Sequence, residues 1–237
     1  LFLSKIKSFA SIEIAGPGFL NIKLTKLALI KNIESIFSNS QFYGSNKTNQ
    51  NYNIEFVSAN PTGPMHVGHC RGAIYGDVIA NLLKFNGNKV TKEYYINDYG
   101  NQINNFVESV FFRIREIKHN EKFKLKENLY PGLYIKEIAK KILDKNKDIN
   151  LDNFDKAFQF LREKSLKESM SLIKNDLSLL GISHDNFFSE TNLVERDLVN
   201  KAVKKLIDKK FVEVGFLQPP KGELDKNWKQ TKRLIFK

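Results

Sequence analysis

The spacing of apolar and polar positions changes along the chain, and each change predicts a different element. Residues 11–24 alternate apolar and polar positions on both sides of a Gly-Pro-Gly turn, which predicts a strand, a turn and a second strand. Residues 25–38 repeat apolar positions every three or four residues, which predicts a helix with one apolar face. An Asn-rich polar stretch then predicts a surface linker over 41–52.

A second pattern follows, in which strands and helices alternate. Residues 53–58 and 89–97 are typical of strands, and residues 67–85 and 103–117 have helical spacing. Units of this length predict parallel strands joined by a right-handed helical crossover, and hence an α/β fold with a Rossmann-like sheet. The residues predicted on the buried side of the first helix are Ile74, Val78, Leu82 and Phe85.

Strand patterns become rare after residue 117, and helical spacing dominates up to residue 210. The remaining predicted elements are helices over 134–145, 152–180 and 195–209, strands over 185–190 and 210–214, and an irregular loop over 216–230. Gly181 is placed to end the longest of these helices. The Rossmann-like part is therefore predicted to carry a mostly helical insertion.

Composition limits the class of protein. With 237 residues, of which 41% are hydrophobic, the chain can bury a sizeable core. The only cysteine is Cys70, so no disulfide can form within the chain and a cytoplasmic location is expected. No uncharged apolar run is long enough for a membrane span, so no membrane contact is expected.

The formal net charge of +12 leaves two interpretations open. Such a charge would attract a polyanion such as RNA or DNA. The abundance of Lys, Asn, Ile and Phe also fits a compositionally biased genome, and no dense block of basic residues occurs. Charge alone therefore does not decide whether the protein binds nucleic acid.

The turn between the first strand and the first helix of the α/β pattern is the strongest candidate for a ligand site. Ligands bind at this edge of open α/β sheets, and a helix amino terminus favours phosphate. Gly63 and Gly68 would let a ligand approach the backbone, and Pro64 would stiffen the loop. His66 and His69 lie one helical turn apart and could direct two donors at one anion. The turn is therefore predicted to bind nucleotide phosphate.

A metal site and a purely structural turn account less well for the histidine pair. A metal site would use His66, His69 and at most Cys70, but no carboxylate-rich motif supplies further ligands, and the spacing differs from that of the H-E-x-x-H helix. No protein-bound metal is therefore expected. A purely structural turn would account for two histidines, but not for Pro, Gly, Asn and His all converging at one strand end.

Polar residues at the ends of the two strands are candidates for substrate contact. Glu55 could form two parallel hydrogen bonds with a guanidinium or pair with an ammonium, although a surface salt bridge is the alternative. Asn97, Asp98 and Gln102 follow the next strand and face the same crevice. Because Asn and Asp are also common in turns, these three are second-rank candidates.

The sequence around this turn resembles a known family. Its "HVGH" resembles the HIGH motif of class I aminoacyl-tRNA synthetases, with Val67 in place of isoleucine, and the longer run "IEFVSANPTGPMHVGHCRGAIYGD" resembles the arginyl-tRNA synthetase family in particular. Later stretches resemble landmarks of that family in the same order, namely "EYYINDYGNQI", "YPGLYIKEIAKKI", "LLGISHDNFFSE" and "PPKGELDKNW". The stretch "IEIAGPGFLNIKL" resembles the end of the family's N-terminal add-on domain, so the likeness spans nearly the whole chain.

The resemblance implies the reaction of an arginine–tRNA ligase, in which arginine and ATP form arginyl-adenylate and the arginyl group then moves to tRNA(Arg). It implies that His66 and His69 are catalytic residues, which stabilise charge on the transferred phosphoryl group. The residues implied to bind ATP are Gly63, Pro64, His66, Gly68 and His69. The residues implied to bind arginine are Glu55, Ser58 and Asn60. Mg²⁺ is expected to accompany ATP, and the protein is expected to be a monomer.

Two elements of the family do not occur in the sequence, namely the KMSKS signature and the anticodon-binding helical domain. The chain therefore looks like the first part of a longer enzyme and is expected to be inactive by itself. The predicted domains are the end of a tRNA-binding α+β add-on domain over 1–40, the linker over 41–52, the first part of the catalytic domain over 53–116, the helical insertion over 117–210 and a return toward the catalytic domain over 211–237.

Two rival functions stay open beside this one. Another nucleotidyltransferase with a HIGH motif would share the turn but would not need the add-on domain. A basic RNA-binding module could keep the nucleotide fold without the reaction. Exchange of pyrophosphate into ATP, measured with and without tRNA, would separate the three.

Overall fold

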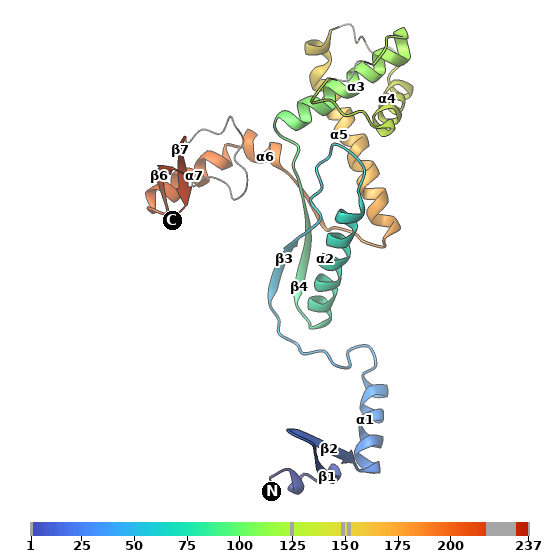
Figure 1. Ribbon diagram of the computed structural model, residues 1–237, viewed down its shortest axis with the longest axis vertical. Helices are drawn as coiled ribbons and strands as arrows, with labels where there is room; N and C mark the ends of the chain where they lie inside the picture. The colour runs from blue at the N-terminus through green and yellow to red at the C-terminus, as the bar shows by residue number, and fades with distance from the viewer. Residues whose placement is uncertain (1, 124–125, 148–149, 151–152, 217–230, 237) are drawn as a thin grey trace. The chain divides into compact units, whose positions relative to one another are not determined.

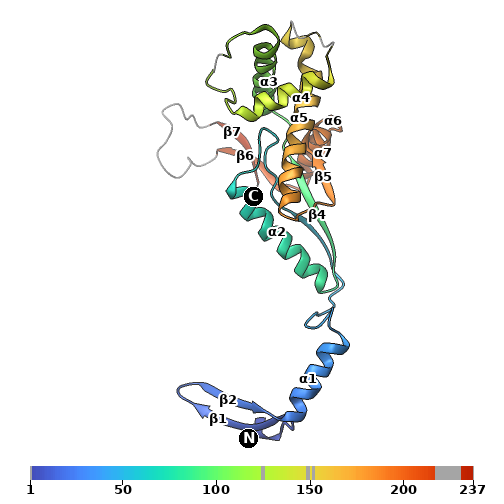
Figure 2. The same ribbon diagram turned by 90° about the vertical axis from the view of Figure 1, so that its right-hand side faces the viewer.

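The computed structural model describes residues 2–123, 126–147, 150, 153–216 and 231–236 (Figures 1 and 2). The chain divides into two compact units. The first comprises Leu1–Tyr52 with Ile79–Val90, and the second comprises Asn53–Val78 with Thr91–Lys237. The two histidines of the candidate site belong to the second unit.

The N-terminal elements have the order that the sequence predicts. They are a 3-10 helix over Leu3–Lys5, strand β1 (Phe9–Ala15), strand β2 (Phe19–Leu24) and helix α1 (Lys26–Ser38). The two strands pair in an antiparallel hairpin. Thr25 caps α1, because its hydroxyl accepts a hydrogen bond of 3.2 Å from the N–H of Ala28. The strand–turn–strand–helix prediction for this part is confirmed.

A parallel sheet forms the centre of the α/β part, with the strand order β3-β4-β5. Its elements in chain order are β3 (Asn51–Glu55), α2 (Val67–Phe85), β4 (Lys89–Ile96), α3 (Asn101–His119) and β5 (Asn186–Ser189). Backbone hydrogen bonds from Lys89 to Gln50 and from Phe56 to Glu93 advance in the same direction along β3 and β4, and β4 pairs with β5 in parallel. The predicted α/β fold with a parallel sheet is confirmed, and β5 joins it from within the segment predicted to be a helical insertion.

The face of α2 that is buried differs from the predicted one, and that prediction is wrong. The residues predicted to be buried are all exposed among the described residues; they are Ile74, Val78, Leu82 and Phe85. Ala73 and Ala80 are fully buried instead, and Gly76 is buried beside Phe56, whose ring a Cβ at residue 76 would overlap. The helix approaches its neighbours so closely that only small side chains fit there.

The segment predicted as a linker contains turns but no helix or strand over residues 39–50. The C-terminal end of this segment is hydrogen-bonded to the side chain of Asn88, which lies just before β4. Asn88 Oδ1 accepts hydrogen bonds from Thr48 Oγ1 at 2.7 Å and from the Gln50 N–H at 2.8 Å. Asn88 therefore fixes the path along which the chain enters β3.

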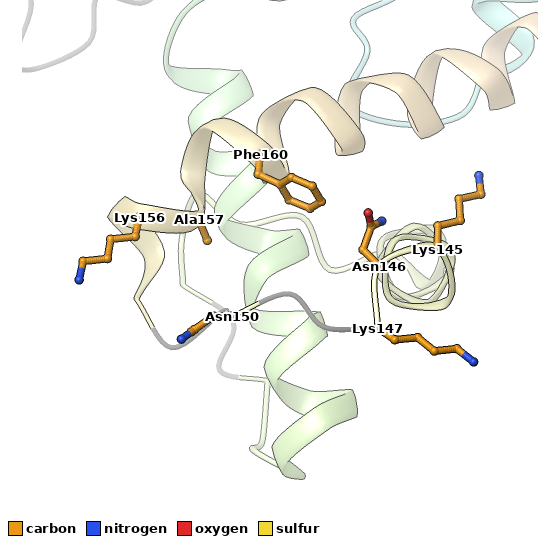
Figure 3. A pocket seen from close by; sticks show the side chains of 7 residues that line it. All are labelled: Lys145, Asn146, Lys147, Asn150, Lys156, Ala157 and Phe160. Atoms are coloured by element: carbon orange, nitrogen blue, oxygen red, sulfur yellow. The ribbon is translucent and has the colours of Figure 1, made fainter.

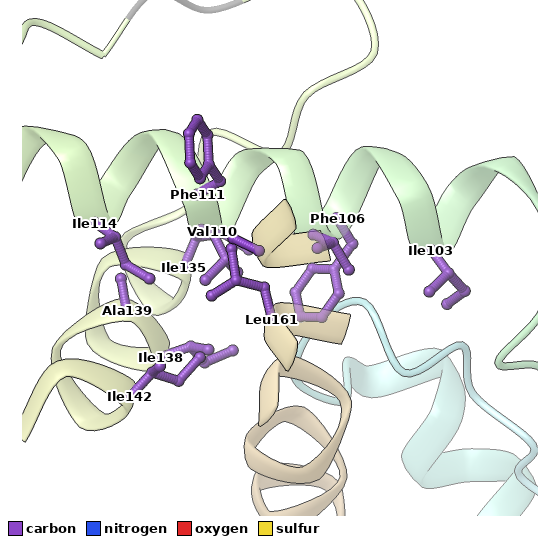
Figure 4. Packing of buried hydrophobic residues seen from close by; sticks show 12 residues of the cluster. Ile103, Phe106, Val110, Phe111, Ile114, Ile135, Ile138, Ala139, Ile142 and Leu161 are labelled. Carbon is purple, nitrogen blue, oxygen red and sulfur yellow. The ribbon is translucent and has the colours of Figure 1, made fainter. Parts of the chain in front are cut away.

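Three helices of the second unit pack around one apolar cluster (Figure 4). They are α3, α4 (Leu133–Lys145) and α5 (Phe154–Leu179). The cluster includes Ile103, Phe106, Val110, Ile114, Ile135, Ile138, Ile142 and Leu161. Among the helices of the described residues, none combines the length and the apolar character needed to cross a membrane.

Left-handed residues set the later helix boundaries. Gly181 has φ +72°, and the Ile182 N–H donates to Leu177 O at 2.9 Å, so α5 ends at the glycine as predicted. The helix predicted over 195–209 is broken, because Asp197 has φ 54°. The observed elements are α6 (Glu190–Glu195), α7 (Leu198–Asp208) and an antiparallel pair of β6 (Val212–Phe216) and β7 (Lys232–Phe236). Residues 217–230 of the predicted irregular loop lie outside the described residues.

His184 lies in the aromatic core beside the sheet. Its ring centroid is 4.3 Å from that of Phe56, 5.3 Å from that of Tyr94 and 5.7 Å from that of Phe187. Neither ring nitrogen makes a well-aligned hydrogen bond with a described residue. Burial lowers the pKa of His184 below its ordinary value of 6.5, so the folded chain keeps this ring neutral.

This burial predicts an acid-sensitive fold. Below pH 6.5 the unfolded chain binds a proton at His184 that the folded chain resists, so the free energy of unfolding falls as the pH drops and recovers above that value. The loss is at most about 1.4 kcal/mol per pH unit. Urea unfolding between about pH 5 and 7.5 should show this slope, and His184→Phe should reduce it. The exposed His119→Asn is the control, and an equal slope in all three proteins would contradict the prediction.

Candidate active site

The candidate site begins where the chain leaves β3 at the carboxyl edge of the sheet. Val57 and Ser58 both have left-handed backbones, with φ 70° and φ 40°. Such a conformation is unusual for a β-branched residue, and strain of this kind clusters at functional sites. The turn is held against β4, because the buried Tyr94 hydroxyl donates to Ala59 O at 2.8 Å.

Ser58 links the neighbouring strand to Glu55. Its Oγ accepts the Tyr95 N–H at 3.1 Å and donates to Glu55 Oε1. The β4 backbone thereby orients an exposed carboxylate at the end of β3. Within the described residues no donor meets Glu55 Oε2, so this oxygen can accept a hydrogen bond from a cationic ligand.

The Pro–Gly part of the turn is fixed by the helical segment. Tyr134 donates from its hydroxyl to Thr62 O at 2.9 Å, and its ring lies against Gly63, where an added Cβ would be 3.1 Å from Tyr134 Cζ. Asp176 Oδ2 accepts the Met65 N–H at 3.2 Å. Gly63 thus has a packing role with Tyr134, and its contact with ATP stays a prediction, as does that of the exposed Pro64.

The two histidines of the turn are brought together. Their rings stack with centroids 3.6 Å apart and an interplanar angle of 16°. The His66 N–H donates to His69 Nδ1 at 3.3 Å, and the His69 N–H donates to His66 Nδ1 at 3.4 Å. An Nδ1 that accepts an N–H leaves Nε2 as the proton-bearing nitrogen, so the pair presents two donors away from its own backbone.

Gly68 leaves room for the His66 ring of this stack. A Cβ at residue 68 would lie 3.0 Å from His66 Cε1, so a larger residue there would require the His66 ring to shift by a small amount. Burial and the nearby His66 together lower the pKa of His69 below its ordinary value of 6.5. At neutral pH, His69 is therefore a neutral hydrogen-bond donor.

The second-rank candidates have different roles. Gln102 accepts from Asn60 Nδ2 at 2.9 Å, so these two predicted residues form one polar pair. Asn97 is exposed. The Asp98 carboxylate accepts from Ser189 Oγ at 2.7 Å and from the Thr191 N–H at 2.9 Å, which joins the ends of β4 and β5 to the start of α6. Those bonds favour a structural role for Asp98.

A hollow of about 450 Å³ lies beside the loop that follows β4. Its lining includes Tyr99, Phe158 and Arg162, none of which the sequence marks as a site residue. Arg162 Nη2 donates to Asp98 O at 2.8 Å and to Thr191 Oγ1 at 2.7 Å. This hollow therefore extends the polar surface at the carboxyl edge of the sheet.

A second hollow, of about 490 Å³, lies between the end of α4 and the start of α5 (Figure 3). It is lined by Lys145, Asn146, Lys147, Asn150, Lys156, Ala157 and Phe160. None of these is a predicted site residue, so this hollow is separate from the chemistry of the turn.

Among the described residues, no group of three or more His, Cys, Asp or Glu side chains could hold a metal ion.

Solved structures with this arrangement define the class of protein. A structure described as a putative arginyl-tRNA synthetase from Campylobacter jejuni matches with a TM-score of 0.72 and 31% identity, over 80% of this chain and 42% of that one. Arginyl-tRNA synthetase from Plasmodium falciparum has the same fold, with a TM-score of 0.60 at 20% identity, over 98% of this chain and 41% of that one. The described sheet and helices thus have the fold of these synthetase structures.

The family model of the class I tRNA synthetases (R), catalytic domain, matches residues 32–215, and the chain belongs to this family. Curated relatives carry the name arginine–tRNA ligase. The protein of Pelagibacter ubique is 52% identical over 100% of this chain and 42% of its own length, and that of Ehrlichia chaffeensis is 45% identical over 99% and 41%. The chain therefore spans less than half the length of these relatives.

Proposed function

We propose that this chain supplies the ATP- and arginine-binding part of an arginine–tRNA ligase. The observation that carries the proposal is the stacked histidine pair in the turn that follows β3, the strand that ends at the oriented carboxylate of Glu55. The two histidine donors can bind a phosphate, and the Glu55 carboxylate can bind a cationic substrate. The family and the names of the relatives support the same reaction.

In the proposed activation step, an arginine carboxylate oxygen attacks the α-phosphorus of ATP. The new oxygen–phosphorus bond forms as the bond to the bridging oxygen breaks, and pyrophosphate leaves with the electron pair. His66 and His69 donate hydrogen bonds to the phosphoryl oxygens, where negative charge is redistributed in the transition state. The protein thus contributes positioning and electrostatic stabilisation rather than a covalent intermediate.

Substrate recognition is proposed at the neighbouring residues. Glu55 would bind a cationic group of arginine, with Ser58 orienting the carboxylate and Asn60 completing the polar wall. A hydroxyl of the terminal tRNA ribose would then attack the carbonyl carbon of the adenylate and release AMP. Mg²⁺ would enter with ATP, bound to its phosphates. A monomeric state and a cytoplasmic location are further parts of the proposal, which rest on the resemblance and on the single cysteine.

Pyrophosphate exchange into ATP tests the proposal in a chimera in which this chain replaces the matching 42% of the Pelagibacter ubique relative. Exchange should require arginine, and tRNA(Arg) should be charged. The chain by itself should show no useful exchange, because its sequence contains no KMSKS element and catalytic groups of this kind act non-additively. Exchange without arginine would indicate a different nucleotidyltransferase, and RNA binding without exchange would indicate an RNA-binding module.

A further inference from the structure

The turn between β3 and α2 begins in a strained conformation. Val57 and Ser58 have left-handed backbones, with φ 70° and φ 40°, and such residues persist only where their surroundings hold them. The Tyr94 hydroxyl holds the start of the turn through a hydrogen bond of 2.8 Å to Ala59 O. The end of the turn, which leads directly into His66, is bound by side chains of two helices that lie much later in the sequence.

We propose that Tyr134 of α4 and Asp176 of α5 are positioning residues for His66, an inference that rests on the function proposed above. The Tyr134 hydroxyl donates to Thr62 O at 2.9 Å, and Asp176 Oδ2 accepts the Met65 N–H at 3.2 Å. Thr62 and Met65 enclose only a Gly-Pro pair, and His66 follows at once. The two bonds therefore fix the backbone from which the His66 ring extends.

The Tyr134 ring fits beside two glycines. A Cβ on Gly63 would lie 3.1 Å from Tyr134 Cζ, and a Cβ on Gly132 would overlap the same ring. Gly63 belongs to the turn and Gly132 directly precedes α4, so the ring connects the helix to the turn. Burial raises the pKa of the Tyr134 hydroxyl above its ordinary value of 10.0, so this group keeps its proton and stays a donor at neutral pH.

Both side chains extend from helices that packing keeps in place. Ile135, next to Tyr134 on α4, is 0% exposed, and Leu177, next to Asp176 on α5, is 2% exposed. Each belongs to a buried apolar cluster, and a helix packed in this way positions a side chain more precisely than a loop does. Pro64 restricts the turn further, because its ring fixes φ. The end of the turn is thus held between two rigid elements.

Loss of either bond should affect the transition state more than the bound nucleotide. The proposed His66 donor acts where charge develops during phosphoryl transfer, so its placement matters most in the transition state. A misplacement of about 1 Å caused far from the reacting atoms can lower a rate about 10²-fold. Removing one bond while the ring and both helices stay in place should move the turn less, so we expect a loss of about tenfold for each bond.

NMR of isotope-labelled histidine rings can follow the position of His66 in the chain itself. The rings of His66 and His69 stack with centroids 3.6 Å apart, so their signals depend steeply on how the two rings lie. Tyr134→Phe and Asp176→Ala should each move both signals by more than the line width, while the signal of the exposed His119 stays in place. Circular dichroism and the urea midpoint should show that the fold is kept.

Each of these variants has a matched control. Tyr130→Phe also removes a hydroxyl from a half-buried ring, but this ring packs edge-on against Phe106 of α3, with centroids 6.1 Å apart, and the histidine signals should stay unchanged. Asp176→Asn keeps an oxygen that can accept the Met65 N–H, so it should preserve the signals that Asp176→Ala moves. If asparagine moves them as far as alanine does, or if no variant moves them, the inference is wrong.

The catalytic effect is measured by pyrophosphate exchange in the chimera. Tyr134→Phe and Asp176→Ala should each lower kcat about tenfold and change the KM for ATP much less, whereas Tyr130→Phe and Asp176→Asn should leave both close to their original values. Gly132→Ala should lower kcat in the same way, because it displaces the Tyr134 ring without removing a donor.

A double-variant cycle shows whether the two residues act through His66. When His66→Ala is already present, adding Tyr134→Phe or Asp176→Ala should lower kcat much less, because the group that they position is gone. An equal loss in both backgrounds would indicate a general effect on the fold and would overturn the inference, as would moved histidine signals with an unchanged kcat. If the unaltered chimera shows no exchange, the proposed function fails, whereas the histidine signals still decide whether these side chains set the turn.

Discussion

Replacing either His66 or His69 by alanine in the chimera is expected to lower kcat for pyrophosphate exchange by about 10²–10³. The reason is that, in the proposed site, the stacked pair would present two donors to one phosphoryl group, where charge develops in the transition state. The KM for ATP should change much less, because ground-state binding also uses the nucleotide's other contacts. Steady-state exchange at several ATP concentrations separates the two effects.

His119→Ala is the control for this experiment, because His119 is an exposed histidine at the end of α3. It should leave kcat unchanged. If His66→Ala and His69→Ala also leave it unchanged, the turn is not the site of activation. If either variant releases zinc and impairs folding, the histidines are metal ligands instead.

Local pattern was sufficient to predict most helices and strands. The spacing of apolar residues differs between helices and strands, so it indicates which kind of element forms. For α2, the observed bounds agree with those predicted. The same periodicity gave the wrong buried face for α2. The observed packing brings Gly76 against Phe56 and Asp77 to Lys92, which are contacts with other elements and leave no mark in the spacing of the helix.

The candidate site shows the same division. The histidine pair could be predicted, because both residues and the glycine beside the His66 ring lie within four positions of one another. The side chains that bind the backbone of the turn, Asp176 and Tyr134, could not be predicted. Asp176 lies 111 residues from Met65, and Tyr134 lies 72 residues from Thr62, so only the folded chain brings them together.

A carboxylate in the middle of a strand, such as Glu93 of β4, would be expected to face solvent and to serve as a control for Glu55. In the structure Glu93 is half-buried, and its two oxygens accept from Asn53 Nδ2 at 3.2 Å and from Asn186 Nδ2 at 2.7 Å, which ties β3 to β5. Replacing it would disturb the sheet. Glu137, exposed on α4, is the better control.

Glu55→Gln in the chimera is expected to weaken arginine binding by about 2–5 kcal/mol, because arginine would cover the carboxylate and leave one partner of a desolvated charge pair without its counterpart. Glutamine keeps the shape and can still accept from Ser58, so the turn should stay intact. The loss should appear in the KM for arginine and leave ATP binding nearly unchanged. Glu137→Gln should have no effect on either.

Comparison of arginine with its neutral isostere citrulline then identifies the group that Glu55 binds. A carboxylate that binds the guanidinium contributes to the preference for arginine, so Glu55→Gln should shrink the ratio of arginine to citrulline activation. A carboxylate that binds the α-ammonium contacts a group that both substrates share, so Glu55→Gln should weaken both equally and leave the ratio unchanged. If neither substrate is affected, Glu55 serves only to fix Ser58 and the left-handed turn beside it, and the cationic site must lie elsewhere.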